Sequence, residues 1–495
     1  MSNSELIVYN SLNRKKEVFE PIKEGFIGMY VCGPTVYSDV HLGNVRTFTS
    51  FDIIYRYLLF KGYKVRYVRN ITDVGHLLDD GEDRMSKGAK LEKLEPMEVA
   101  QKYTNGFHNM MRIFNTHRPS IEPRATGHII EQIEMVQQII DNGFAYERNG
   151  SVYFDTVKFH NEKNCYGDLS GRVIEELMSE TRDDLKNQGE KNHPSDFAIW
   201  MKASPDHLMK WNSPWSVGFP GWHLECSAMS TKYLGQRFDI HGGGNDLKFP
   251  HHENEIAQNV GACNCSPAKY WLHTNMLLMN GKKMSKSDGN TITPDQLFTG
   301  DSPHVSKGYT PMVVKFFMLQ SHYSSTLDLT DDALLAAEKG YKKLMEAKIN
   351  LQKLESNNEG AGADDQVITD LIGAFTADMD DDFNTPKAIS RLFELVTKIN
   401  AYKDGHQDIN QVSSSVLTLL KEKFNSYIED VLGLLNDLSS DNSDKMDGLM
   451  ELVIELRQMA RADKNWATAD KIRDGLNELE IVLKDGKEGT SWTLK

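Results

Sequence analysis

Of all its segments, residues 26–72 restrict the possible fold of this chain most strongly. Their first part is rich in β-forming residues and ends at a Gly33-Pro34 turn, which predicts a strand and then a loop. Residues 45–60 place apolar side chains on one helical stripe, and residues 64–72 predict a second strand. A strand, a helix and a strand in succession form a βαβ unit, which requires a parallel sheet. The pattern therefore predicts an α/β fold.

The loop between this strand and this helix carries the box His41-Leu-Gly43-Asn44. A helix N-terminus offers free N–H groups and a dipole that favours phosphate. His41 is placed to donate to phosphate oxygens, and Gly43 lets a nucleotide approach the backbone closely. A helix-capping turn with an incidental histidine would have the same sequence, so the box alone leaves both interpretations open.

A second motif, Lys283-Met-Ser-Lys286-Ser287, lies in a glycine-bounded loop at 281–290. Two lysines three residues apart, interleaved with serines, form a mobile cationic clamp that suits a triphosphate. The alternative is a solvated basic loop, which is the usual role of a short charge run.

Together the two motifs resemble the signatures of the class I aminoacyl-tRNA synthetases. The first is similar to their HIGH box and the second matches their K-M-S-K-S signature letter for letter. The resemblance implies a Rossmann-type catalytic domain, ATP with Mg²⁺ and an aminoacyl-adenylate. It implies that His41 and Asn44 stabilise the α-phosphate, that Lys283 and Lys286 hold the leaving phosphates, and that Gly43 and Lys286 contact ATP. Asn44 departs from the signature, which has a second histidine there, because Asn44 can donate a hydrogen bond but carries no charge.

A candidate metal site combines residues that lie far apart in the sequence. His251 and Glu255 are four residues apart after Pro250, so they share one face of a predicted helix. Cys32 and Cys226 would complete a tetrahedral site of two thiolates, one imidazole and one carboxylate. Two structural cysteines beside a polar helix face would give the same sequence, and His252 is a competing ligand by its spacing.

The runs Cys-Gly-Pro-Thr at 32–35, WHLECS at 222–227, HGGG at 241–244 and PHHENE at 250–255 resemble the cysteinyl-tRNA synthetases. The resemblance implies Zn²⁺ on Cys32, Cys226, His251 and Glu255. Zinc prefers a thiolate to a hydroxyl, and shape separates cysteine from serine by only about 1–3 kcal/mol. The hypothesis is that the substrate sulfur binds this metal, which selects the side chain.

Further residues are expected to line the substrate site. Thr72 follows the second predicted strand, where loops usually bind ligands. Trp222 and His241 would wall the amino-acid pocket, and Asp246 would bond the ribose of ATP. Core packing for Trp222, and strand-end capping for Thr72 and Asp246, are the structural alternatives. A CxC pair at 263–265 and Cys165 have no partner that indicates a metal.

Changes of pattern along the chain predict its domain organisation. The catalytic domain is expected at 1–325, with an insertion at about 118–200 that holds a helix at 127–143 and a hairpin at 151–159. An all-α region is expected at 326–440, and the resemblance to the family implies that it is the anticodon-binding domain. SSDNSD at 439–444 then marks a linker. A small unit follows at 445–495, and the resemblance implies that it contacts tRNA. Its candidate tRNA contacts are Trp466, Arg457, Arg461, Lys464, Lys471 and Arg473.

Composition narrows the class of protein. The formal charge is −15, which argues against a protein that coats nucleic acid nonspecifically. Residues 351–382 hold nine acidic residues and one lysine, a net charge of −8, so the other residues total only −7. Five cysteines, no predicted signal peptide and no long apolar run indicate a cytoplasmic protein.

The resemblance implies ATP-dependent ligation of L-cysteine to its tRNA, and a monomer is what the family leads us to expect. One alternative is an enzyme that forms the same adenylate but transfers cysteine to a small amine. Such an enzyme would not need the long helical tail after the catalytic domain. A second alternative is a catalytically inactive RNA-binding or zinc-binding protein, which the intact signature lysines and metal quartet disfavour.

Overall fold

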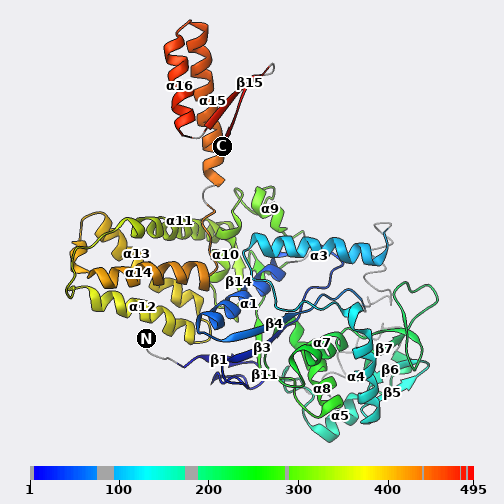
Figure 1. Ribbon diagram of the computed structural model, residues 1–495. Helices are drawn as coiled ribbons and strands as arrows, with labels where there is room; N and C mark the ends of the chain where they lie inside the picture. Colours follow the sequence, from blue (N-terminus) through cyan, green and yellow to red (C-terminus); the bar gives the residue numbers. More distant parts are fainter. Residues whose placement is uncertain are drawn as a thin grey trace. The chain divides into compact units, whose positions relative to one another are not determined.

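The computed structural model describes residues 5–74, 94–172, 188–284, 289–437, 440–479, 481–486 and 489–494 (Figure 1). The chain divides into two compact units, Met1–Leu435 and Asn436–Lys495. Within the described residues, no helix is both long enough and apolar enough to cross a membrane.

A four-stranded parallel sheet lies at the centre of the first unit. Its strands are β3 (Phe26–Val31), β4 (Lys64–Arg69), β10 (Phe238–Gly244) and β11 (Ala268–Thr274), in the spatial order β11-β10-β3-β4. The chain runs from β3 to β4 on one side and later adds β10 on the other side of β3. The order of the strands therefore reverses between β3 and β10, and this switch point is where open α/β sheets bind ligands. The predicted parallel α/β fold is confirmed.

Helices cover both faces of this sheet (Figure 1). Helix α1 (Leu42–Phe60) packs on β4, β10 and β11, and α7 (Leu224–Leu234) packs on β3 and β4. Gly242 allows the close approach of α1, because a Cβ there would lie 2.2 Å from the Phe51 ring. Helices α3 (Pro96–Ile113), α4 (Ile129–Asp141) and α8 (Glu253–Cys263) and the hairpin of β1 (Ile7–Asn10) with β2 (Lys15–Val18) complete this part.

The segment predicted as an insertion forms its own antiparallel sheet in the order β5-β6-β7-β9-β8, and this sheet extends to Pro220, beyond the predicted end at about 200. The strands are β5 (Ala145–Arg148), β6 (Ser151–Phe154), β7 (Phe197–Lys202), β8 (Trp211–Asn212) and β9 (Val217–Pro220). The hairpin predicted at 151–159 is wrong, because β6 pairs with the preceding β5 and helix α5 (Thr156–Lys163) follows it. Asp155 starts that helix by accepting a hydrogen bond from the Lys158 backbone N–H.

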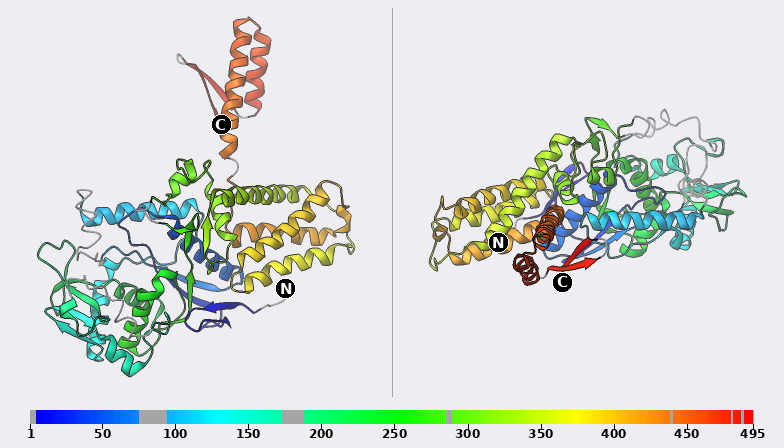
Figure 2. Two further views of the ribbon diagram at one scale, coloured as in Figure 1. Left: turned by 180° about the vertical axis from the view of Figure 1, so that it is seen from behind. Right: turned by 90° about the horizontal axis from the view of Figure 1, so that it is seen from above.

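A small sheet joins the catalytic part to the helical part. It consists of β12 (Leu277–Met279), β13 (Lys282–Lys283) and β14 (Leu327–Leu329), in the order β13-β12-β14. Helices α9 (Pro294–Thr299) and α10 (Pro311–Leu319) lie between β13 and β14 in the sequence. The predicted all-α region follows as a bundle of α11 (Asp331–Lys353), α12 (Asp365–Asp380), α13 (Thr385–Lys403) and α14 (Ser414–Ser426) (Figure 2).

The second unit holds two helices and a β-hairpin: α15 (Ser440–Ala462), α16 (Trp466–Glu478), β15 (Ile481–Gly486) and β16 (Gly489–Leu494). Its core contains Met450, Leu476 and Ile481. The linker predicted at 439–444 is wrong for residues 440–444, which form the start of α15. Serine and aspartate favour helix N-termini as well as loops, so their composition did not distinguish the two.

Candidate active site

A cleft of about 380 Å³ opens at the carboxyl ends of β3 and β10, at the switch point of the sheet. Cys32 and the loop after β3 line this cleft, together with Trp222 and Asp246. Cys226 and His251, whose side chains are buried, also line it. The cleft therefore joins the nucleotide box at the start of α1 to the cysteines and histidine of the candidate metal site.

The four predicted metal ligands lie together and are all buried. Each of Cys32, Cys226, His251 and Glu255 offers one ligand atom, and these atoms lie within 4.8 Å of one another. The two sulfurs are 3.6 Å apart, and Cys32 Sγ is 3.5 Å from Glu255 Oε1. His251 Nε2 is 3.2 Å from the same carboxylate oxygen. These are ligand types that Zn²⁺ takes, and four is the number of protein ligands at its tetrahedral structural sites.

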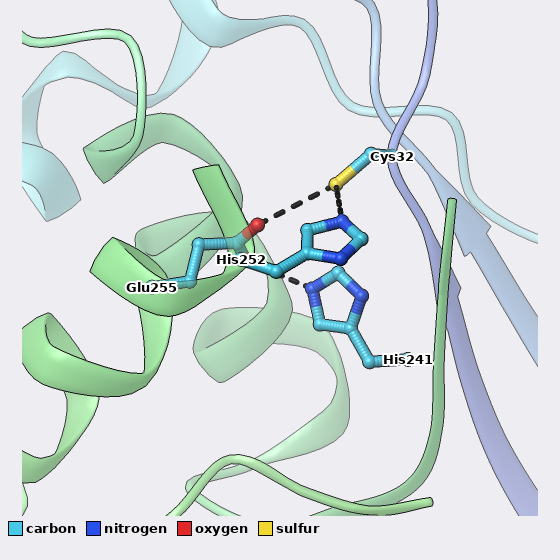
Figure 3. A group of neighbouring side chains, drawn as sticks. All are labelled: Cys32, His241, His252 and Glu255. Atoms are coloured by element: carbon cyan, nitrogen blue, oxygen red, sulfur yellow. Dashed lines mark hydrogen bonds and ion pairs between the residues drawn. The ribbon is translucent and has the colours of Figure 1, made fainter. Parts of the chain in front are cut away.

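A second group shares two of these residues. Cys32, Glu255, His241 and His252 also bring ligand atoms within 4.8 Å of one another (Figure 3). Cys32 Sγ lies 3.3 Å from His252 Nε2, and His241 Nε2 lies 2.8 Å from Glu255 Oε2. The competing role of His252 that the spacing suggested is therefore also possible in space. His252 differs from His251 in that it does not line the cleft.

The electrostatics of the buried group do not choose between the two sets, because Cys32 and Glu255 belong to both. Burial opposes ionisation of Cys226, but the hydrogen bond from Cys32 and the contact with His251 lower its pKa to about 6. Burial also opposes ionisation of Glu255, yet His241 and His251 lower its pKa to about 2. Burial lowers the pKa of His252 well below its usual value, so this imidazole stays neutral. Burial also opposes the charge on His251, but the contacts with Cys226 and Glu255 outweigh it and raise the pKa of His251 to about 10. Because a metal binds the neutral imidazole, His251 loses a proton when an ion binds there.

The nucleotide box forms the N-terminus of α1. His41 is the N-cap residue, and its Nδ1 accepts a hydrogen bond from the Asn44 backbone N–H at 3.3 Å. Asn44 Oδ1 accepts from the His41 backbone N–H in return, which makes a capping box. A Cβ on Gly43 would lie 3.0 Å from the His41 ring. The capping interpretation is thus correct for the local structure, and the box also lines the cleft through His41 and Asn44.

The second signature lies only partly within the described residues. Lys283 is exposed on β13 and does not line the cleft. Lys286 lies outside the described residues. The Asn280-Gly281 turn between β12 and β13 has positive φ at both residues, as a tight two-residue hairpin requires.

The residues predicted for substrate binding divide into two groups. Thr72, Trp222 and Asp246 line the cleft. His241 does not, because it is fully buried behind Glu255 and stacks on Trp271 with 4.3 Å between the ring centroids. His241 therefore orients the carboxylate rather than contacting the cleft.

Sequence reasoning missed two contributions to the cleft. Asn70 accepts from the Gly33 N–H at 2.8 Å and from the Cys226 thiol at 3.7 Å, so it ties the β3 loop to the second cysteine. Its position at the carboxyl end of β4 was the available signal. Tyr103 and Phe107 line the cleft from α3, and nothing in that helix's sequence links it to the box.

The remaining predicted residues lie elsewhere. Cys165, Cys263 and Cys265 are partly buried free thiols, and none belongs to a metal-binding group found among the described residues. In the second unit, Trp466 is 56% exposed, whereas Arg457 is buried. Arg473 forms ion pairs with Asp470 and Asp474.

Comparison with known families identifies the three parts of the chain. Residues 18–339 match the tRNA synthetases class I (C) catalytic domain, residues 374–436 the DALR domain, and residues 450–492 the cysteinyl-tRNA ligase anticodon binding domain. The chain is 49% identical to the cysteine–tRNA ligase of Bacteroides thetaiotaomicron and 50% identical to that of Bacteroides fragilis, with 99% of both chains covered in each case. It belongs to the cysteine–tRNA ligase family.

Similar folds occur in synthetases of other specificity. Mycobacterium tuberculosis methionyl-tRNA synthetase in complex with methionyl-adenylate superposes with a TM-score of 0.59 at 13% identity, covering 82% of this chain and 92% of that chain. A putative arginyl-tRNA synthetase from Campylobacter jejuni gives 0.54 at 10% identity, covering 84% and 94%. These similarities confirm the predicted class I fold. The anticodon-binding name belongs to the family that matches 450–492, so the anticodon role predicted for 326–440 stays a prediction.

Proposed function

We propose that this chain activates L-cysteine with ATP and transfers the cysteine to the 3′ end of its tRNA. The observation that carries the proposal is one cleft lined both by the N-terminus of α1, with His41 and Asn44, and by Cys32, Cys226 and His251 of the buried Cys₂HisGlu group. The relatives named cysteine–tRNA ligase support it along nearly the whole chain. The cytoplasmic location and the monomeric state stay predictions.

The donor set fits zinc. Two thiols, one imidazole and one carboxylate, all buried, are ligands that Zn²⁺ takes at tetrahedral sites. Cys32, Cys226, His251 and Glu255 would hold the ion, which when bound supplies affinity for a thiolate over a hydroxyl. His241 fixes Glu255 through the 2.8 Å contact, and His223 Nδ1 lies 2.9 Å from His251 Nδ1. Such contacts orient ligands and raise their affinity for metal.

ATP is proposed to bind at the start of α1. The free N–H groups of that helix and the imidazole of His41 would stabilise negative charge on the α-phosphate. Asn44 holds His41 in the cap, so its contribution is to orient the histidine as well as to donate. Lys283 and Lys286 would neutralise the leaving phosphates with Mg²⁺, and Asp246 would bond the ribose.

The cysteine side chain would lie between the ATP site and the buried donor group. Thr72 and Trp222 line this part of the cleft and would position the amino acid. Gly33 brings the β3 loop against Asn70, so the two sides of the pocket are joined. The reaction needs no covalent enzyme intermediate, and catalysis then rests on positioning and electrostatics.

The test is charging of tRNA with labelled cysteine, serine and other amino acids, with and without a zinc chelator. We expect cysteine alone to be attached, and we expect the chelator to abolish the preference for cysteine. Transfer of cysteine to a small amine without tRNA would support the alternative ligase. Cysteine selection that survived complete metal removal would refute the role proposed for zinc.

A further inference from the structure

We infer that Arg46 is a positioning residue for adenylate formation: it fixes the strand pair that carries Lys283 against the helix that carries the nucleotide box. This inference rests on the proposed function and adds a residue that neither signature contains. Arg46 lies on α1, two residues after Asn44, and only 2% of its surface is exposed.

The Arg46 guanidinium joins α1 to two other segments through backbone carbonyls. Its Nη1 donates to the Met276 carbonyl at 2.5 Å, and its Nη2 donates to the carbonyls of Ser325 and, at 3.4 Å, His322. Met276 directly precedes β12, and Ser325 lies just before β14. Arg46 therefore contacts the chain immediately before both of these strands.

These two strands set the place of Lys283. Strand β14 pairs in parallel with β12, and β12 pairs antiparallel with β13, where Leu278 faces Lys283. A shift of β12 or β14 relative to α1 would move Lys283 relative to His41 by a similar amount. Because Lys283 and His41 are proposed to act on one triphosphate, the distance between them affects the rate of adenylate formation.

The chemistry at Arg46 favours a specific role over simple packing. The recorded hydrogen bonds of Arg46 all go to backbone carbonyls, no carboxylate among the described residues forms an ion pair with it, and burial lowers its pKa to about 10. An apolar side chain of similar size would avoid the cost of burying this charge. A guanidinium presents five donors in a fixed fork, which lets one side chain hold three carbonyls from two segments.

The segment before β14 is also held from its other side. His322 Nε2 lies 2.8 Å from the Asp382 carbonyl oxygen, and the Tyr323 hydroxyl donates to Asp382 Oδ1 at 2.8 Å. Asp382 and Phe383 both have positive φ, at 64° and 53°, a conformation that non-glycine residues rarely adopt. The helical bundle thus anchors this segment, and Arg46 joins it to the nucleotide box.

The first experiment replaces Arg46 with Met and, separately, with Lys in the full-length protein. Cysteine-dependent ATP–pyrophosphate exchange gives kcat and the KM values for ATP and cysteine. We expect Arg46→Met to lower kcat by about 100-fold and to raise the KM for ATP, with the KM for cysteine unchanged. Arg46→Lys should be intermediate, because an ammonium cannot hold both segments in the same geometry.

Arg56→Met is the matched control. Arg56 is also buried on α1 and also donates to three carbonyls, but these belong to Asn115, Glu429 and Asp430. We expect this variant to unfold more easily and to keep the KM for ATP. If Arg56→Met reproduced the kinetic pattern of Arg46→Met, general destabilisation would explain both and the inference would be wrong.

A double-mutant cycle with Lys283→Ala tests the route of the effect. If Arg46 acts by placing Lys283, then Arg46→Met should have little further effect on kcat in the Lys283→Ala background. The inference would be wrong if the double variant lost kcat by the product of the two single-variant losses. It would also be wrong if Arg46→Met raised the KM for cysteine or kept the wild-type kcat. If Arg46→Met fails to fold, Arg46→Lys is judged by the same criteria. A wild-type chain without cysteine-dependent exchange would instead refute the proposed function.

Discussion

Gly33 occupies a position where the cleft has no room for a side chain. A Cβ there would lie 1.6 Å from the Asn70 carbonyl oxygen, so Gly33→Ala must displace either the β3 loop or Asn70. We expect a loss of about 1–3 kcal/mol in the free energy of unfolding and a higher KM for cysteine. Urea denaturation and exchange kinetics measure the two effects.

Gly106→Ala is the control for this substitution. Gly106 lies within α3, a Cβ there would meet no other group within 4 Å, and alanine favours helix. Equal stability and kinetics in the Gly33 and Gly106 variants would show that the contact with Asn70 does not constrain the pocket.

The role of Cys226 as a zinc ligand can be tested by a single substitution. Cys226→Ser replaces a sulfur ligand by a weaker oxygen ligand at nearly the same place. We expect bound zinc to fall from one per chain to a small fraction, measured by atomic absorption after dialysis. We also expect kcat/KM for cysteine relative to serine to fall by about 10- to 200-fold. Cys165→Ser is the control, because Cys165 lies outside the metal group, and an unchanged metal content in Cys226→Ser would contradict the assignment.

Helices α1 and α10 meet at a buried cluster of charges that supports the whole catalytic unit. Asp52 accepts from Arg56 Nε at 2.7 Å, and Lys315 Nζ lies 3.4 Å away with its side chain fully buried. Asp52→Asn leaves two buried cations without a counter-charge, so we expect a loss of about 3–5 kcal/mol in the free energy of unfolding. Urea denaturation at pH 7 measures it, and the exposed Asp370→Asn variant should unfold like the wild type.

The same carboxylate predicts how stability depends on pH. Burial would raise the pKa of Asp52, but Lys315, His117 and Arg56 outweigh burial and hold it well below its usual value. Its stabilisation is therefore complete above its unfolded pKa of about 4 and is lost as pH falls further. The difference between wild type and Asp52→Asn should shrink in urea titrations below pH 4. A constant difference from pH 7 to pH 3 would contradict this origin.

At the level of helices and strands, the sequence correctly predicted the elements that follow from local patterns. The βαβ unit and the helices after residue 330 followed from periodicity, and the nucleotide box was correctly placed between strand and helix. The hairpin at 151–159 failed because Asp155 caps a helix, and an aspartate after a strand can equally start a turn.

In the candidate site too, local spacing predicted some features, and tertiary packing determines the others. The spacing of His251 and Glu255 predicted a shared face, but spacing could not choose between His251 and His252, since both reach Glu255 or Cys32 in the folded chain. Asn70 and α3 enter the cleft through tertiary packing, which single-sequence periodicity does not encode.

Over the whole molecule, charge and domain structure together limit how RNA can bind. The total charge is −15, and residues 351–382 in the helical bundle carry −8 of it. Because the net charge is negative and more than half of it lies in one segment, we expect tRNA to bind along a restricted face away from residues 351–382. We expect charging to weaken steeply as salt increases and random RNA to bind poorly at physiological salt.

Removal of residues 436–495 is expected to separate adenylate formation from the transfer of cysteine to tRNA. Every residue that lines the cleft lies in the first unit, so cysteine-dependent pyrophosphate exchange should stay close to that of the full chain. The removed unit includes the match to an anticodon binding domain and the exposed Trp466. If its tRNA contacts contribute about 1.4 kcal/mol or more, kcat/KM for tRNA charging falls at least tenfold. Charging at the wild-type rate would assign tRNA binding to the first unit, and a parallel loss of exchange would show that the cleft depends on the second.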